Sequence, residues 1–186
     1  MVLTLRFFHF VEQLSGLCHH YLVKTLINIW TNPETGTKFR FEYNHTDSFE
    51  GLDVNKVRQV YGVCFYKNQI VIVKIKSMWI LPGGRREEGE SIEEVLKREI
   101  MEETNMEVLE WKPIGVQTVF EFGNEEEPYY QLRVMCRVRP FGPFVSDPDG
   151  GVIANKLIDP KDYKQYFDWG EIGEEIIKKA ILLSSS

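Results

Sequence analysis

One helix, whose two ends are both marked in the sequence, constrains the fold of this chain most. Ser91 followed by Glu94 is a capping box, in which each side chain accepts a hydrogen bond from the other residue's backbone N–H. We therefore expect a helix from about Ile92. It should end near Asn105, because asparagine tolerates the left-handed conformation of a C-terminal cap. Its apolar positions, which must pack against another element, are Ile92, Val95, Leu96 and Ile100.

Segments with strand-like alternation lie before and after this helix. Apolar and polar residues alternate in most of them, and residues 70–73 form a continuous apolar run that fits a buried strand. Loops are expected over 123–128 and 140–151, and a second amphipathic helix over 171–183. The expected strands are residues 38–44, 61–65, 70–73, 114–122, 132–138 and 152–157. This order predicts an α/β fold in which helices cover both faces of a mixed sheet.

The N-terminal region has a different pattern. Apolar residues at three- and four-residue spacing predict an amphipathic helix over residues 14–30, closed by Pro33 and Gly36. The residues of this pattern are Leu14, Leu17, Cys18, Tyr21, Leu22, Leu26 and Ile29. We divide the chain into an N-terminal extension over 1–35 and a main domain over 36–186. The apolar face of the extension is expected to pack on the main domain or on a partner chain, which makes a homodimer a hypothesis.

Charge and composition exclude several classes of function. The 22 Lys and Arg against 28 Asp and Glu give a net charge of −6, which argues against a protein that binds nucleic acid through massed phosphate contacts. Charged and polar residues interrupt every apolar run in the first thirty positions, far short of the roughly 18 residues that a membrane span needs. No membrane association is therefore expected. Three cysteines are few for 186 residues and favour a reducing cytoplasm.

Three glutamates lie on the face of the expected helix opposite its apolar stripe. Glu99, Glu102 and Glu103 stand at i, i+3 and i+4, where like charges destabilise a helix by a few tenths of a kcal/mol per pair. Two of them are near the C-terminal end, where the helix dipole also disfavours anions. A solvated acidic face is the ordinary explanation of such a run. A divalent cation would reverse the sign of these effects, since carboxylates are hard ligands suited to Mg²⁺ or Mn²⁺.

The spacing around these glutamates resembles the signature of the Nudix hydrolases. Gly84, Glu90, Arg98-Glu99-Ile100, Glu102-Glu103 and Met106 stand at the signature's spacing, and Asn105 replaces the usual Gly. The preceding Leu81-Pro82-Gly83 is also typical of the family. The signature covers 23 residues, and the order of strands and helices from about Val57 to Leu183 fits the family's α/β/α sandwich. The resemblance does not reach residues 1–50.

This resemblance implies a role for each matched residue. Glu99, Glu102 and Glu103 correspond to the family's metal-binding glutamates, and the carbonyl of Gly83 corresponds to a backbone ligand of the metal. Arg98 would orient the carboxylates by ion pairing. Glu90 corresponds to an acid that ties the loop to the helix. The Gly83-Gly84 pair allows backbone to approach a pyrophosphate closely.

The reaction implied by the resemblance is hydrolysis of a pyrophosphate bond in a nucleoside diphosphate linked to another group. The cofactor would be Mg²⁺, or Mn²⁺, and the substrate a small nucleotide derivative rather than nucleic acid. A general base must accept the proton of the attacking water, and several acids remain open for that role. They are Glu99, Glu103, Glu125, Glu126, Glu127, Asp147 and Asp149.

Two other functions remain open at this level. A nucleotide-binding sensor could keep the fold without turnover, although such proteins usually lose a glutamate or the arginine that this chain retains. An isomerase of small diphosphates would need further catalytic residues that the sequence does not identify. Cys18-His19-His20 is not interpreted as a metal site, because adjacent histidines on a helix point about 100° apart. Cys64 and Cys136 are expected to be core thiols.

Overall fold

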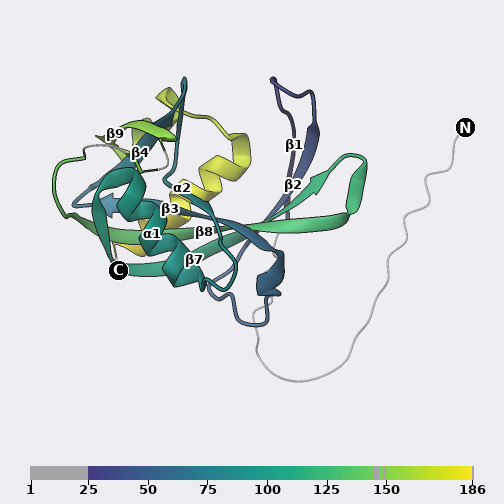
Figure 1. The fold of residues 1–186 in the computed structure, drawn as a ribbon, viewed down its shortest axis with the longest axis horizontal. Helices are drawn as coiled ribbons and strands as arrows, with labels where there is room; N and C mark the ends of the chain where they lie inside the picture. The colour runs from purple at the N-terminus through teal and green to yellow at the C-terminus, as the bar shows by residue number, and fades with distance from the viewer. Residues whose placement is uncertain (1–24, 145–146, 149, 186) are drawn as a thin grey trace, which may run out of the picture.

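A computed structural model describes residues 25–144, 147–148 and 150–185. Its strands join in one sheet, in the order β1-β2-β7-β8-β3-β4-β5, with β6 paired to β3 and β9 paired to β4. All pairs are antiparallel except β3 with β8, so the sheet is mixed, as expected. Figure 1 shows the sheet with α1 and α2 packed on it. The strands are β1 Leu26–Thr31, β2 Lys38–His45, β3 Val57–Tyr66, β4 Gln69–Ile75, β5 Met78–Ile80, β6 Gly83–Arg85, β7 Met106–Glu121, β8 Asn124–Pro140 and β9 Val152–Ile158.

Two hydrophobic cores lie on opposite faces of this sheet, one under each α-helix. Helix α1, Ile92–Thr104, buries Val95, Leu96 and Ile100 against one face. Helix α2, Gly170–Ser184, buries its own apolar stripe against the other. The strands alternate accordingly, so that Val60 and Cys64 of β3 face α1 while Val63 faces α2. The expected α/β/α sandwich is therefore confirmed. Short 3₁₀ helices at Val54–Lys56 and Pro160–Gln165 complete the regular structure.

The N-terminal helix was a wrong prediction for the part that the structure describes. Residues Leu26–Thr31 form β1, whose partner is β2, and only Leu26 of the expected apolar face is buried there. Ile29, which fitted the helical period, is 59% exposed. Hydrogen bonds to β2 and the stack of Trp30 on Phe39 favour the extended conformation, so tertiary pairing overrides the local pattern. The rest of the expected helix, the homodimer residues on it and the Cys18-His19-His20 run lie outside the described residues.

The loop expected over residues 123–128 was also wrong. Strand β7 runs to Glu121 and β8 begins at Asn124, so a tight turn with Gly123 at φ 94° joins them. Residues 125–127 consequently belong to β8. The hairpin extends beyond the region where β8 pairs with β3 and projects from the sandwich beside β1 and β2 (Figure 1). Cross-strand pairing extends these strands through charged residues that carry no strand signal of their own.

Both ends of α1 are built as predicted. The Ser91 hydroxyl accepts from Glu94 N–H, and the Glu94 carboxylate accepts from Ser91 N–H. Asn105 caps the other end in the left-handed conformation, with φ 53° and ψ 40°. Its side-chain Nδ2 donates to Pro143 O at 2.7 Å, which ties the end of α1 to the following loop. No helix among the described residues is long and apolar enough to cross a membrane.

Replacing Asn105 separates its two contributions. Asn105→Gly keeps the left-handed backbone and loses only the bond to Pro143, so the free energy of unfolding should fall by about 1 kcal/mol. Asn105→Ala loses the same bond and places alanine, which tolerates the left-handed conformation less well than asparagine or glycine, at that position, so a further loss of about 1 kcal/mol is expected. Urea denaturation measures both. Equal losses in the two variants would contradict the role of the backbone conformation.

Candidate metal-dependent active site

The three glutamates singled out in the sequence lie near the C-terminal end of α1, the helix that contacts β6. Glu99, Glu102 and Glu103 project from the last turns of α1, and β6 with its Gly83-Gly84 pair lies beside that helix. Glu99 is mostly buried at 14% side-chain exposure, Glu102 is more open, and Glu103 is buried. The structure therefore brings the predicted acids and the predicted glycine together at one edge of the sheet.

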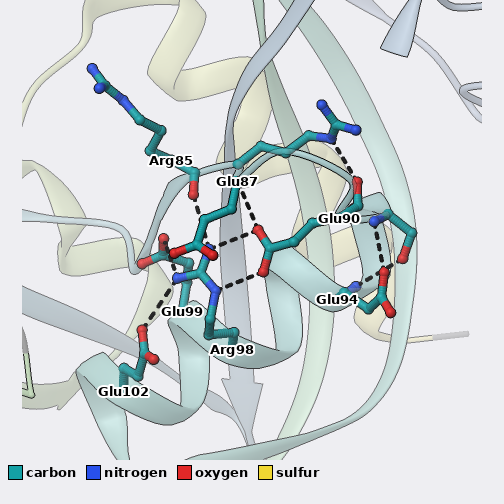
Figure 2. A network of polar contacts seen from close by, with 9 residues as sticks. Arg85, Glu87, Glu90, Glu94, Arg98, Glu99 and Glu102 are labelled. Atoms are coloured by element: carbon teal, nitrogen blue, oxygen red, sulfur yellow. Dashed lines mark hydrogen bonds and ion pairs between the residues drawn. The ribbon is translucent and has the colours of Figure 1, made fainter. Parts of the chain in front are cut away.

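Arg98 is the centre of the ion pairs around these acids (Figure 2). Its Nε and Nη2 form a two-pronged contact with the carboxylate of Glu90 at 2.7 and 2.9 Å. Its Nη1 donates to Glu99 at 2.9 Å and to Glu102 at 3.3 Å, and Nη2 also donates to Arg85 O at 3.0 Å. Arg98 therefore pairs with Glu99 and Glu102, as expected. One guanidinium fixes the loop before α1 and two of the acids on it.

Glu90 ties this loop to the helix. Besides pairing with Arg98, its carboxylate accepts from Glu87 N–H at 2.8 Å, and its carbonyl accepts from Arg86 Nε at 2.7 Å. The Arg98 guanidinium is the main reason that the pKa of Glu90 falls to about 2. Glu90 is therefore charged at neutral pH and locked in place.

Glu103 has the opposite electrostatic environment. Its Oε2 accepts from Gly83 N–H at 2.7 Å, and burial raises the pKa of its carboxyl to about 8, with the charge of Glu99 adding to the rise. Burial also raises the pKa of Glu99, against the lowering effect of Arg98. Burial therefore disfavours the charged forms of two neighbouring acids, and Arg98 offsets this only in part for Glu99.

The glycines of β6 allow these acids to approach the backbone. A Cβ on Gly84 would lie 2.4 Å from a carboxylate oxygen of Glu99. A Cβ on Gly83, whose φ is 132°, would lie 2.2 Å from Val60 O of the paired strand β3. Position 83 therefore requires glycine to admit the neighbouring strand, and glycine at position 84 leaves room for the Glu99 carboxylate where it now lies.

Comparison with known proteins agrees with this geometry. The model of the NUDIX domain matches residues 56–179, which is two thirds of the chain and includes β3 to most of α2. The chain belongs to the NUDIX domain family. The 84–106 segment is thus its Nudix box, with Asn105 in the place of glycine.

Individual relatives resemble the chain over a short segment or at low sequence identity. A protein of Bacillus subtilis (strain 168) named "Putative 8-oxo-dGTP diphosphatase" is 42% identical over 64 residues, which cover 33% of this chain and 43% of the relative. The match thus spans less than half of that relative. Among solved structures, the pyrophosphohydrolase BsRppH of Bacillus subtilis has a TM-score of 0.61 at 15% identity, covering 86% of this chain and 98% of that one. A Nudix hydrolase of Nitrosomonas europaea has a TM-score of 0.52 at 19% identity, with 66% and 87% covered. At these identities the structural likeness shows the fold.

The chemistry of the Nudix-box acids fits a divalent cation. Among the described residues, no three carboxylate, imidazole or thiol groups are already gathered in the arrangement of a metal site. Arg98 and the Gly83 N–H instead engage oxygens of Glu99, Glu102 and Glu103. Each carboxylate has a second oxygen, and carboxylate and carbonyl oxygens are the ligands that Mg²⁺ and Mn²⁺ prefer. The raised pKa values of Glu99 and Glu103 show that added positive charge would stabilise their ionised forms.

The acids considered as general base fall in different places. Glu99 and Glu103 lie at the site, and the charge of Asp147 contributes to the raised pKa of Glu103. Asp147 also accepts from Val152 N–H at 2.7 Å. Residues 125–127 lie on the projecting part of the β7–β8 hairpin, away from the pairing of β8 with β3, and Asp149 lies outside the described residues. The geometry therefore favours Glu99, Glu103 and Asp147 over the hairpin acids.

One polar group near the site was missed at the sequence level. Arg133 is only 4% exposed, although the alternation of β8 made it resemble an ordinary polar position. Around it are three glutamines of neighbouring strands, Gln59, Gln117 and Gln131, and the ring of Tyr61. Glutamine at matching positions of three strands was the available signal. It carries meaning only once the strand register is known.

Proposed function

We propose that this chain hydrolyses a pyrophosphate bond in a nucleoside diphosphate linked to another group, with the aid of a divalent metal ion. The observation that carries the proposal is the contact of Glu103 with Gly83 and of Glu99 with Gly84, inside a segment that the NUDIX domain model matches. Arg98 links Glu99 to Glu102 on the same helix. Bound there, Mg²⁺ or Mn²⁺ would neutralise the phosphates and lower the pKa of an attacking water.

The residues of the site divide this work. Glu99, Glu102 and Glu103, with the Gly83 carbonyl, would hold the cation. Arg98 orients two of these carboxylates through contacts of 2.9 and 3.3 Å and is itself held by Glu90. The absence of a Cβ at Gly84 leaves space beside the Glu99 carboxylate, where a phosphate group could approach the backbone.

A proton acceptor for the attacking water is available at the same place. Burial raises the pKa of both Glu99 and Glu103, to about 8 for Glu103, so either carboxylate could accept a proton from the attacking water. Asp147 is the alternative supplied from outside the helix. We assign the role of general base to this group of three.

The compartment that we propose is a reducing cytoplasm. Cys64 and Cys136 are partners in register on the neighbouring strands β3 and β8, and both are free and buried. Two thiols at such close quarters that remain unbridged are consistent with a reducing environment.

The test is hydrolysis across a panel of substrates, with Mg²⁺, with Mn²⁺ and with chelator. The panel holds nucleoside triphosphates including 8-oxo-dGTP, nucleotide sugars, ADP-ribose, dinucleoside polyphosphates and coenzyme A. We expect metal-dependent turnover of one class and its loss in Glu102→Gln. The matched control is Glu93→Gln, which removes an exposed acid from the first turn of the same helix. Nucleotide binding without any metal-dependent turnover would contradict the proposal and favour a sensor.

A further inference from the structure

A group of polar side chains that the proposed reaction does not use lies on the α2 face of the sheet. Gln59 of β3 pairs in register with Gln131 of β8, which pairs with Gln117 of β7. Tyr61 pairs in the same way with Arg133. Because side chains two residues apart on a strand share a face, these five residues form one surface, which we name the glutamine–arginine cluster.

Hydrogen bonds join the members of this cluster. Gln131 Oε1 accepts from Gln117 at 3.0 Å and from Arg133 Nη2 at 2.9 Å. Gln131 Nε2 donates to Gln59, and Gln59 Nε2 donates to the Tyr61 hydroxyl at 2.9 Å. The amides thereby hold the guanidinium and the phenol in fixed positions. Such a connected network holds these side chains in one arrangement, so they do not move independently of one another.

Arg133 is a buried cation without a carboxylate partner among the described residues. It is 4% exposed, and its Nε has no hydrogen-bond partner there. Its guanidinium lies 4.8 Å from the ring centre of Tyr61 and 5.8 Å from that of Trp169, and burial lowers its pKa to about 10. Buried charges are normally paired. Its Nη1 donates to Leu132 O at 3.3 Å and its Nη2 to Gln131, but its Nε–H has no acceptor in the part of the chain that the structure describes. That donor is available to a bound group.

The position of Arg133 relates it to the Nudix-box acids. Tyr61 pairs with Gly83 on one side and with Arg133 on the other. Neighbouring strands lie about 4.8 Å apart, so the backbones of Gly83 and Arg133 are separated by about 10 Å. The charges of Glu103 and Glu99 also act on Tyr61 and raise its pKa, after burial. One nucleotide with its pyrophosphate beside Gly83 could therefore extend its base to the glutamine–arginine cluster.

We propose that Arg133 binds the base of the substrate and selects a 6-oxopurine, guanine or hypoxanthine, over adenine. Arginine only donates hydrogen bonds, and the O6 and N7 atoms of a 6-oxopurine are adjacent acceptors that match one guanidinium. Adenine presents an amino donor at position 6, which would face the donors of Arg133. The amides of Gln59 and Gln117 can donate or accept, so they suit the rest of the base edge. The inference rests on the proposed function, because the pyrophosphate site sets where the base lies.

The test measures binding without turnover. Dissociation constants for GMP, IMP and AMP are measured by calorimetry on the full chain with chelator present. We expect the wild type to bind GMP and IMP at least 10-fold more tightly than AMP. Arg133→Met should lose this preference without a fall in melting temperature, since an apolar side chain replaces an unpaired buried cation. Arg137→Met, on the same strand but bonded to Glu110 and Ser184, is the matched control and should leave the preference intact.

A second variant at the same position tests the role of the guanidinium. Arg133→Lys retains the charge and loses the planar fork, so it should fold normally, lose the preference and raise KM for GTP about 10-fold with little change in kcat. A wild type without preference, or a preference that survives both Arg133 variants, overturns the assignment even if the enzyme hydrolyses GTP. A preference lost in both variants supports it even if no nucleotide is hydrolysed, and in that case only the proposed reaction fails.

Discussion

Glu103→Gln is expected to lower kcat/KM by about 10³-fold or more while leaving the metal-free protein at least as stable as the wild type. Glutamine keeps an oxygen that accepts from Gly83 N–H, so the contact at 2.7 Å survives. It removes a carboxyl whose ionisation is disfavoured by burial, which raises the pKa of Glu103 to about 8, and by the charge of Glu99. What the variant loses is an anionic ligand, and the loss of such an electrostatic contact typically costs 10²–10³-fold or more in rate.

Thermal unfolding with and without metal distinguishes this role from a structural one. The wild type should gain several degrees in Tm when Mg²⁺ or Mn²⁺ is added, because an ion that binds only the folded state stabilises it. Glu103→Gln should show little of that gain, whereas Glu93→Gln should retain both the gain and the activity. Activity within 10-fold of the wild type would show that Glu103 is not a ligand. A large fall in the metal-free Tm would show that it is structural instead.

Local sequence signals predicted the part of this molecule that lies within one helix and its flanks. The Ser91–Glu94 box, the left-handed Asn105 and the spacing of the three glutamates depend on residues a few positions apart, and the structure has all of them. Arg98 was expected to reach Glu102 one turn away, and it does so at 3.3 Å. Its stronger contact with Glu90, eight residues back, depends on the path of the loop.

Features that depend on strand register could not be predicted in the same way. The segment Leu26–Thr31 fits a helical period, but pairing with Lys38–His45 makes it a strand. The glutamine–arginine cluster depends on β3 and β8 lying parallel in the register that places Tyr61 beside Arg133. These residues are 72 positions apart, and alternation along either strand gives no information about the other. From the sequence alone, the buried Arg133 therefore looked like an ordinary surface residue.

Gly83→Ala is expected to be the most destabilising single substitution at the site, with a loss of about 4 kcal/mol or more in the free energy of unfolding. The residue has φ 132°, and a Cβ there would lie 2.2 Å from Val60 O and 2.7 Å from Tyr61 Cα. Both atoms are backbone of a buried strand, so neither can move without breaking the β3–β6 pair. Steric overlap combined with a backbone conformation closed to alanine belongs to the few mechanisms that produce losses of this size.

Substitutions at two other glycines distinguish the steric part of this loss from the conformational part. Gly36 has φ 72° and nothing within 4 Å of the built Cβ, so Gly36→Ala should cost only the conformational penalty, about 1–2 kcal/mol. A Cβ on Gly84 would meet the side chain of Glu99, which can rotate away, so Gly84→Ala should fold but displace that acid and lose activity. Urea denaturation and the metal-dependent assay are run on all three. If Gly83→Ala cost no more than Gly36→Ala, the close approach of β6 to β3 would be wrong. The backbone of Gly83 would then not be held where a metal ligand is needed.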